Sequence, residues 1–238
     1  MIEYRATDLP GKNAYEKQFN VQVRCITPVE QKYILSLSQK EQRTTKEYIE
    51  FLKKLIQIDN PEVKFEDLYW FDIQYLLYKI RYVTYAKYPI KLIFKCPDCN
   101  SEITKELDIG TLQIDEPNIE NKKIILDNLG EVKIRSKIIQ DDMDIETFMK
   151  KNHIAEDDIQ TRLLLIDLCL IKGDKPLDEV YKLAEQGDIT ASDIITIEKW
   201  IEDNIWGVKE ELNIKCPHCQ KEASRGYALS IEDFFSIV

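Results

Sequence analysis

Two stretches of the sequence decide the fold: Lys95-Cys96-Pro97-Asp98-Cys99-Asn100-Ser101-Glu102 and its near copy, Lys215-Cys216-Pro217-His218-Cys219-Gln220-Lys221-Glu222. Both follow the pattern Lys-Cys-Pro-x-Cys-x-x-Glu. A short run that alternates apolar and polar residues precedes each block, at 90–94 and 211–214, and another extended-looking run follows it. This context predicts two β-hairpins, each with a Cys-Pro-x-Cys turn, or zinc knuckle, at its tip.

The four cysteines of the two blocks suit one structural metal site. Two thiolate pairs supply the four sulfur ligands that tetrahedral Zn²⁺ prefers, and two copies in matching context are a stronger signal than one Cys-x-x-Cys. In a common zinc ribbon about 15–20 residues separate the pairs, whereas residues 100–215 separate them here. If one ion binds both pairs, the ribbon is split, and a large insert lies between its two halves.

Two other uses of Cys-x-x-Cys fit this context less well. Redox-active pairs usually open a helix after a strand, where the helix dipole lowers the thiol pKa, but extended segments flank both blocks. A catalytic zinc keeps an open position beside three protein ligands, and four cysteines would close it. His218 stands between two cysteines of its own knuckle, so we expect it to face solvent as a spacer.

No other reaction centre is evident in the sequence. His153 lies in a polar segment, and the chain lacks the glycine-rich phosphate loops, zinc-protease motifs and nucleophile elbows of common enzymes. The acidic clusters at 141–144 and 156–158 lack a calcium-loop pattern and suit helix N-termini better. We therefore predict that the protein is not an enzyme.

The composition is that of an ordinary globular protein with an excess of acid. The 238 residues include 43 Asp and Glu against 33 Lys and Arg, for a net charge of −10, which disfavours nucleic acid as a partner because that surface needs a basic patch. We expect no signal peptide and no bilayer span. Cys25 and Cys169 stand in apolar contexts typical of buried free thiols, which favours a reducing cytosol over a disulfide framework.

Helix-capping patterns divide the rest of the chain. Residues 1–18 show little hydrophobic pattern and are expected to form an arm, and 19–25 alternate as a strand. Thr27 and Glu30 form a capping box for a helix to about 38, and a second box, from Thr44 to Glu47, opens another that ends at Asn60-Pro61. Later elements are expected at these positions: a long helix at 66–86, a hairpin at 122–135 with Gly130 in its turn, and helices at 141–149, 156–170, 177–186 and 190–205.

The long helix carries a row of tyrosines. Tyr75, Tyr78, Tyr82 and Tyr85 are spaced by three and four residues, beside a second face of Ile and Leu. Both faces could pack inside the protein, or the tyrosine row could face a partner, since Tyr is enriched at interfaces. The N-terminal arm and the tail at Phe234-Phe235 are the other candidates for partner contact; the alternatives are disorder of the arm and docking of the tail within the chain.

Three stretches carry a resemblance to a known family. Thr27-Pro28 opens a helix after a strand, the run Phe71-Asp72-Ile73-Gln74-Tyr75-Leu76-Leu77-Tyr78-Lys79-Ile80-Arg81 follows, and a strand leads into Cys96-Pro97-Asp98-Cys99. Together they resemble the T4-type baseplate hub proteins of contractile-tailed bacteriophages, best over residues 19–140. Asn100 stands where many ribbons carry Gly, so the first knuckle turn is expected to differ slightly.

The resemblance implies a place and a mode of action. It implies a structural or assembly component of the virion's tail baseplate hub, assembled in the host cytoplasm, that contacts other baseplate and tail proteins, with room for an oligomer in the baseplate. The acidic charge and the short apolar runs, in turn, lead us to expect neither nucleic acid nor membrane as a partner. It implies no catalytic residues. The alternative from another class is a zinc-ribbon adaptor or regulator of nucleic-acid machinery, and a thiol oxidoreductase is a third.

The predicted fold is α+β, a split four-cysteine zinc ribbon with N-terminal helices and a helical insert between the knuckles. One structural Zn²⁺ per chain is expected on Cys96, Cys99, Cys216 and Cys219. The expected parts are as follows: residues 1–89, an arm, a strand and three helices; 90–115 with 206–229, the split ribbon; 116–205, a hairpin and helical insert; 230–238, the C-terminal tail.

Overall fold

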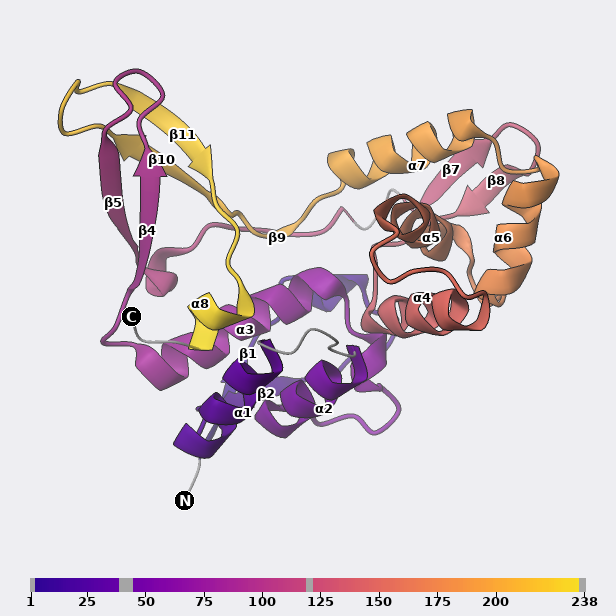
Figure 1. The fold of residues 1–238 in the computed structure, drawn as a ribbon. Helices are drawn as coiled ribbons and strands as arrows, with labels where there is room; N and C mark the ends of the chain where they lie inside the picture. The colour runs from indigo at the N-terminus through magenta and orange to yellow at the C-terminus, as the bar shows by residue number, and fades with distance from the viewer. Residues whose placement is uncertain (1–2, 39–44, 119–121, 236–238) are drawn as a thin grey trace.

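The computed structural model describes residues 3–38, 45–118 and 122–235, which form three lobes (Figure 1). The first lobe, here called the body, contains the N-terminal sheet, helices α1 to α3 and the C-terminal helix α8. The second is a pair of hairpins, β4–β5 and β10–β11. The third, here called the insert, contains β7, β8 and helices α4 to α7, and lies beside the body on the side away from the hairpins. The chain is therefore a mixed α+β protein.

A three-stranded antiparallel sheet begins the body. Its order is β1 (Tyr4–Thr7), β2 (Val21–Arg24) and β3 (Ile56–Ile58). Val23 of β2 lies opposite Arg5 on one side and Ile56 on the other. The expectation of a free arm at 1–18 is wrong for residues 4–15, because β1 is paired and Leu9 is buried. A short 3₁₀ turn, η1 (Lys12–Ala14), follows.

Three helices cover this sheet: α1 (Pro28–Ser38), α2 (Thr45–Leu55) and α3 (Trp70–Tyr85). The 3₁₀ turn η2 (Phe65–Asp67) precedes α3, so the long helix begins four residues later than expected. Buried side chains of α2 and α3 meet the two inward valines of β2 in one core. Thr44, the expected cap of α2, lies outside the described residues.

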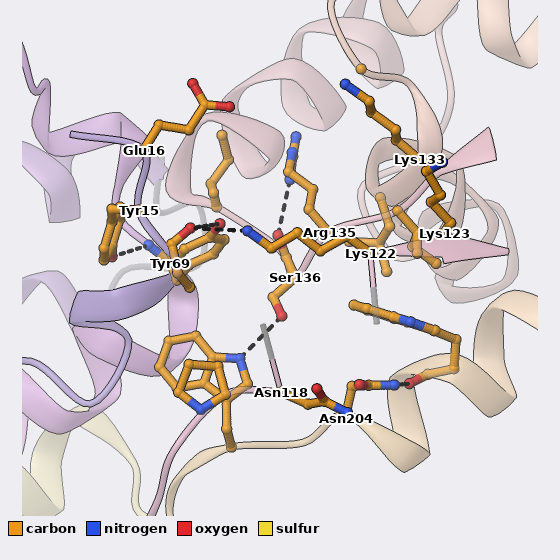
Figure 2. Close-up of a pocket in the computed structure, with 18 of the residues that line it drawn as sticks. Tyr15, Glu16, Tyr69, Asn118, Lys122, Lys123, Lys133, Arg135, Ser136 and Asn204 are labelled. Atoms are coloured by element: carbon orange, nitrogen blue, oxygen red, sulfur yellow. Dashed lines mark hydrogen bonds between the residues drawn. The ribbon is translucent and has the colours of Figure 1, made fainter. Parts of the chain in front are cut away.

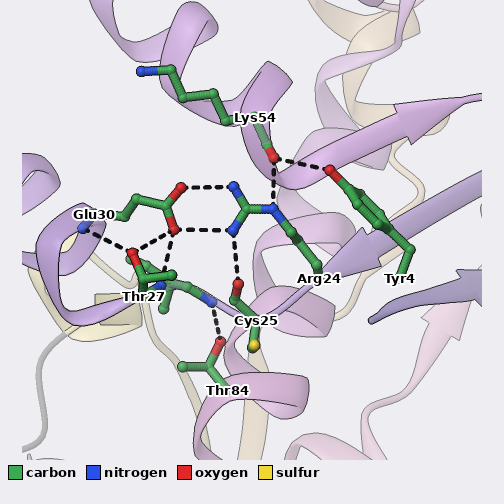
Figure 3. A network of polar contacts seen from close by, with 8 residues as sticks. Tyr4, Arg24, Cys25, Thr27, Glu30, Lys54 and Thr84 are labelled. Atoms are coloured by element: carbon green, nitrogen blue, oxygen red, sulfur yellow. Dashed lines mark hydrogen bonds and ion pairs between the residues drawn. The ribbon is translucent and has the colours of Figure 1, made fainter. Parts of the chain in front are cut away.

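A polar network at the start of α1 joins four elements of the body (Figure 3). The Glu30 carboxylate accepts from the Thr27 backbone N–H at 2.9 Å, and Thr27 Oγ1 accepts from the Glu30 N–H at 3.3 Å, which confirms the predicted capping box. Arg24 of β2 binds both Glu30 oxygens, at 2.6 and 3.0 Å, and donates to the Lys54 carbonyl of α2. Thr84 of α3 accepts from the Ile26 N–H. The cap of one helix therefore also fixes its sheet and its neighbours.

The C-terminal helix α8 (Ile231–Phe235) closes the body from the other end of the chain. Phe235 is completely buried against Phe51 of α2, with ring centroids 5.9 Å apart. Phe234 lies edge-on to Tyr78, at 4.9 Å. Arg81 of α3 donates at 2.9 Å to the carbonyls of Asp233 and Phe234. These contacts make the last described helix part of the first lobe.

The insert has its own hydrophobic cores. The hairpin β7 (Lys123–Leu126) and β8 (Gly130–Lys133) turns through Gly130, whose φ of +68° suits a residue without a Cβ. Four helices follow: α4 (Ile139–Lys151), α5 (Ile159–Ile171), α6 (Leu177–Gln186) and α7 (Ala191–Asp203). One core lies among α4, α5 and α6, and a second joins α5 and α7 to the hairpin.

Two short strands join the insert to the rest of the chain. β6 (Ile114–Asp115) enters the insert and β9 (Gly207–Val208) leaves it, and the two pair antiparallel. Gly207 has a φ of +93°, and a Cβ there would lie 3.2 Å from Phe71 Cβ of α3. The start of α4 also contacts the body, since the Ile139 N–H donates to the Leu68 carbonyl. No helix within the described ranges is long and apolar enough to cross a membrane.

Candidate metal centre

Two hairpins present the Cys-Pro-x-Cys turns, and both use the same register. β4 (Ile90–Lys95) pairs with β5 (Glu102–Leu107), and β10 (Glu211–Lys215) pairs with β11 (Glu222–Gly226). Lys95 lies opposite Glu102, and Lys215 lies opposite Glu222. The spacing that the two sequence blocks share is thus the length of one hairpin tip. A short 3₁₀ turn, η3 (Ile109–Thr111), follows the first hairpin.

The backbone of the two tips repeats the same hydrogen bonds. In the first, the Cys96 N–H donates to the Ser101 carbonyl and the Asn100 N–H donates to the Cys96 carbonyl, each at 2.9 Å. In the second, Cys216 and Lys221, then Gln220 and Cys216, make the equivalent bonds at 2.9 and 3.0 Å. Asn100 and Gln220 have φ values of +58° and +61°. The first turn therefore has the left-handed geometry of a glycine turn without a glycine.

The four thiols meet between the tips. The Sγ atoms of Cys96, Cys99, Cys216 and Cys219 all lie within 4.8 Å of one another. Sγ of Cys96 lies 3.6 Å from Sγ of Cys219, and Sγ of Cys99 lies 3.6 Å from that of Cys216, both far longer than the roughly 2.0 Å of a disulfide. Ideal tetrahedral zinc with Zn–S bonds of about 2.3 Å separates its sulfurs by about 3.8 Å. The cluster fits one ion bound by all four cysteines.

Ser101 lies among the thiols and favours the charged form of two of them. Its Oγ is 3.0 Å from Cys99 Sγ and 3.4 Å from Cys216 Sγ. Contact with this hydroxyl lowers the pKa of the Cys99 thiol and, together with backbone N–H groups, lowers the pKa of the Cys216 thiol to about 5. At Cys219, the Lys221 backbone N–H lowers the thiol pKa, but burial and the neighbouring thiols outweigh it and raise the pKa to about 12. Because metals bind thiolates, the lowered pKa values of Cys99 and Cys216 favour metal binding at those two ligands. We did not identify Ser101 from the sequence, although it lies inside the first block.

In the described part of the chain, few contacts besides those of the thiols join the two hairpins. Each is a separate two-stranded sheet, with no ladder between them. Their shared core consists of Ile103, Ile214 and two of the cysteines, with Phe94 and Leu212 packed at its edge. An ion pair between Asp98 of the first tip and Lys221 of the second spans the outside. His218 is exposed at the second tip, as expected of a spacer.

The residues expected to face a partner are mostly inside the body. Tyr78 and Phe235 are completely buried and Phe234 is 4% exposed, because α8 docks on α3 at Tyr78. Tyr75 is 7% exposed. Tyr85 is half-buried and its hydroxyl reaches the Phe235 carbonyl at 3.4 Å. Tyr82 is 43% exposed. Among these six residues, Tyr82 offers the largest fraction of its surface to a partner, and a contact there stays a prediction.

Comparison with known proteins gives one informative result. A family model described as T4 bacteriophage base plate protein matches residues 1–236. The chain belongs to this family. The match to this baseplate family covers both hairpins, the insert and the body, so it concerns the whole fold rather than the cysteine motif. No curated protein and no solved structure matches the chain. Membership of the T4 baseplate family supports a structural role in the phage baseplate.

Proposed function

We propose that this T4 baseplate family protein is a structural or assembly component of the baseplate hub, held in shape by one zinc ion and acting through contacts with other tail proteins. The family match over 1–236 carries the proposal. The site supports a structural use of the metal, because four cysteine ligands leave no coordination position for a substrate.

The position of the thiol cluster between the two hairpins suggests a division of the chain into a zinc ribbon, a supporting body and an insert. The two hairpins with their thiol cluster form a split zinc ribbon, the body supports it, and residues 116–205 form an insert. In this division the metal joins the segments on either side of the insert, and the β6–β9 pair closes the insert nearer its base. The metal therefore fixes the hairpins relative to each other, and the surfaces of the three lobes are left for partners.

Metal analysis tests whether the four cysteines bind one zinc ion per chain. The purified protein is expected to hold one zinc per chain, and Cys96→Ser or Cys216→Ser should remove it, since loss of one ligand opens the site. Cys25→Ser is the matched control, because Cys25 is a half-buried thiol outside the cluster. Two zinc ions per chain, or none in protein prepared without chelator, would rule out the shared site.

Fractionation of tail assembly intermediates tests whether the protein is part of the baseplate hub. Tail assembly intermediates from infected cells are separated by sedimentation, and the protein is followed by quantitative mass spectrometry. We expect it in baseplate or hub intermediates, with reduced recovery for Cys216→Ser. Its absence from every intermediate and from the finished particle would contradict the proposed function even if zinc is bound.

A further inference from the structure

The cavity where the body meets the insert does not select a ligand by charge (Figure 2). Its volume is about 510 Å³, and Trp206 closes part of it, with Nε1 donating to Ser136 Oγ at 3.1 Å. Its charged lining is of both signs, with Lys122, Lys123 and Lys133 against Glu16, Asp67 and Asp174. Another part of the insert, the exposed side of α5, has apolar side chains and charge of one sign.

Helix α5 is apolar nearly all round. After its first turn, from Leu163 to Ile171, its only polar residue is Asp167. A helix of this kind is ordinarily covered on every side. Helices α4, α6 and α7 cover the C-terminal half of α5, where residues 167–170 are all buried. The N-terminal half has an uncovered side, since Ile159 is 65% exposed and Leu163 is 51% exposed.

These two exposed side chains lie in line with Asp167. Residues four apart are neighbours on one face of a helix, so Ile159, Leu163 and Asp167 form a stripe along α5, here called the α5 stripe. Asp167, at its inner end, is only 6% exposed, and its carboxylate makes no hydrogen bond or ion pair within the described part of the chain. Its two oxygens are not sealed from solvent, in contrast to the unbonded Oδ1 of Asn204. A donor from outside the chain can therefore reach them.

Glu198 of α7 is a second acid beside Asp167. Burial, and then the charge of Glu198, raise the pKa of the Asp167 carboxyl to about 6, and no basic side chain of the described residues opposes this rise. Asp167 is still mostly ionised at pH 7 with such a pKa. Glu198 is exposed and has no ion-pair partner within the same ranges. The inner end of the α5 stripe thus presents two carboxylates that the chain does not neutralise.

The basic side chains of α5 and α7 are engaged or directed elsewhere. Arg162 lies 3.9 Å from Asp142, and Lys172, just after α5, lies 2.8 Å from Asp144, both acids being on α4. Lys199 directly follows the second acid in the sequence, which places it about 100° further round α7. The uncovered side of α5 is therefore both apolar and acidic, which suits a partner that is apolar and basic.

We propose that the α5 stripe, with Glu198 beside it, binds a segment of another baseplate protein in which a Lys or Arg stands among apolar residues. The cation pairs with the two carboxylates, and the apolar side chains cover Ile159 and Leu163. A segment without a cation would bury Asp167 further and leave it unpaired, which is strongly unfavourable. The inference rests on the proposed function, because it names the partner's chemistry for a protein that acts through contacts with other tail proteins.

Photocrosslinking during phage assembly tests this surface. A phage that lacks its own copy of the gene is grown in cells that supply the full chain with p-benzoylphenylalanine in place of Leu163, and mass spectrometry identifies the crosslinked segment. We expect an adduct with one baseplate protein, at a segment in which a Lys or Arg stands among apolar residues. The same photoreactive residue in place of Lys182, which is exposed on α6, is the control and should not give this adduct.

Charge removal assigns the contact to Asp167. Asp167→Asn should reduce the adduct at position 163 by about tenfold or more, the usual effect of breaking a buried charge pair. The urea midpoint of the purified variant should stay the same or rise, because the free chain no longer buries an unpaired charge. Glu185→Gln makes the same kind of change at an exposed acid of α6, and should alter neither the adduct nor the midpoint. Replacement of the partner's Lys or Arg by Gln should reduce the adduct as Asp167→Asn does.

The outcomes separate this proposal from the proposed function. No adduct at position 163, an adduct with a second copy of this chain, or an adduct with a segment that lacks Lys and Arg would overturn the surface, whatever the fractionation of assembly intermediates shows. So would an undiminished adduct or a lowered urea midpoint for Asp167→Asn, since the carboxylate would then serve the free chain. An adduct with a basic, apolar segment of a tail protein outside the hub would support the surface and count against the place in the hub.

Discussion

At the scale of the residue, Asp72 explains why the N-terminal segment lies on the body. This carboxylate is completely buried, and it accepts from the Gly11 N–H at 2.9 Å and from the Tyr15 hydroxyl at 2.6 Å. Burial raises the pKa of Asp72 to about 6, and the two hydrogen bonds oppose that rise. The segment 8–15 is therefore tied to α3 by this acceptor, in addition to the burial of Leu9 in the body core.

Gly11 is required for this contact, so Gly11→Ala should destabilise the protein. A Cβ at position 11 would overlap the Trp206 ring and the Asp72 carboxylate. We expect a loss of about 1–3 kcal/mol in unfolding free energy, the usual cost of overpacking, measured by urea unfolding. Gly110→Ala is the control, since the nearest atom to a Cβ there is the exposed Asp108 side chain at 3.2 Å. Equal effects of both changes would argue against the contact.

Glu30 should give the body a characteristic response to acid. The hydrogen bonds and charge of Arg24 lower the pKa of Glu30 to about 2, from an ordinary value near 4.5. A carboxylate with a lowered folded-state pKa stabilises the fold above about pH 4.5, and this contribution is lost as the pH falls toward 2. Glu30→Gln should therefore cost about 2 kcal/mol at pH 7 and progressively less below pH 4.5.

Urea unfolding of both proteins between pH 7 and pH 3 measures this difference. Glu62→Gln is the control, because Glu62 is an exposed carboxylate whose side chain is 72% accessible. A difference between wild type and Glu30→Gln that stays constant over the whole range would show that the ion pair does not stabilise the fold through its charge.

At the scale of the element, α8 contributes more to the body than its five residues suggest. Phe235→Ala removes a completely buried ring from the contact with Phe51, and such a change typically costs about 3–5 kcal/mol. Thermal or urea unfolding should show this loss. Tyr82→Ala, on the exposed side of α3, should change stability by no more than about 0.5 kcal/mol. A small effect of Phe235→Ala would mean that α8 is not docked in solution.

Elements with local signals could be predicted from the sequence. A capping box joins two residues three positions apart in the sequence, so it can be recognised without knowledge of the fold. The predicted starts of α1 at Thr27 and of α7 at Thr190 are both confirmed by their hydrogen bonds. The role of the four cysteines as metal ligands could be predicted for a similar reason, because it follows from the residue type and from the short spacing within each pair. Their approach to within 4.8 Å supports that prediction across the long separation.

Elements that depend on distant partners could not be predicted. β1 has no alternating pattern of buried and exposed residues, and it exists because β2 offers an edge. The tyrosine row was correctly placed on one helix, but what covers it comes from α8, at the far end of the chain. The same holds for the cavity, where Asn204, Lys133 and Tyr15 meet only in the folded molecule.

At the scale of the whole molecule, each lobe has a hydrophobic core of its own, and that of the hairpin pair is the smallest. The body core also takes in Ile90 and Leu107, at the end of the first hairpin away from the cysteines, and Ile139 of α4. A two-stranded hairpin is marginally stable in water by itself. The hairpins should therefore depend on the metal far more than the other two lobes do, since zinc binding at such sites contributes about 10 kcal/mol or more.

Removal of the metal should accordingly loosen one lobe. With a chelator, we expect amide hydrogen exchange to speed up in β4, β5, β10 and β11, while β2 and α3 keep their protection. Hydrogen-exchange mass spectrometry measures this, with zinc added back as the control for reversibility. Loss of protection throughout the body would show that the three lobes unfold as one unit.

The docking of α8 on the body also has a consequence for synthesis of the chain. The core around Phe51 and Tyr78 is not filled until residues 231–235 reach it, and these are translated after both hairpins and the entire insert. Until residues 231–235 have left the ribosome, the apolar surface of α2 and α3 around these two rings therefore remains uncovered. Completion of the first lobe is coupled to translation of both hairpins and the entire insert, so a host chaperone that binds apolar surface would have its longest access there.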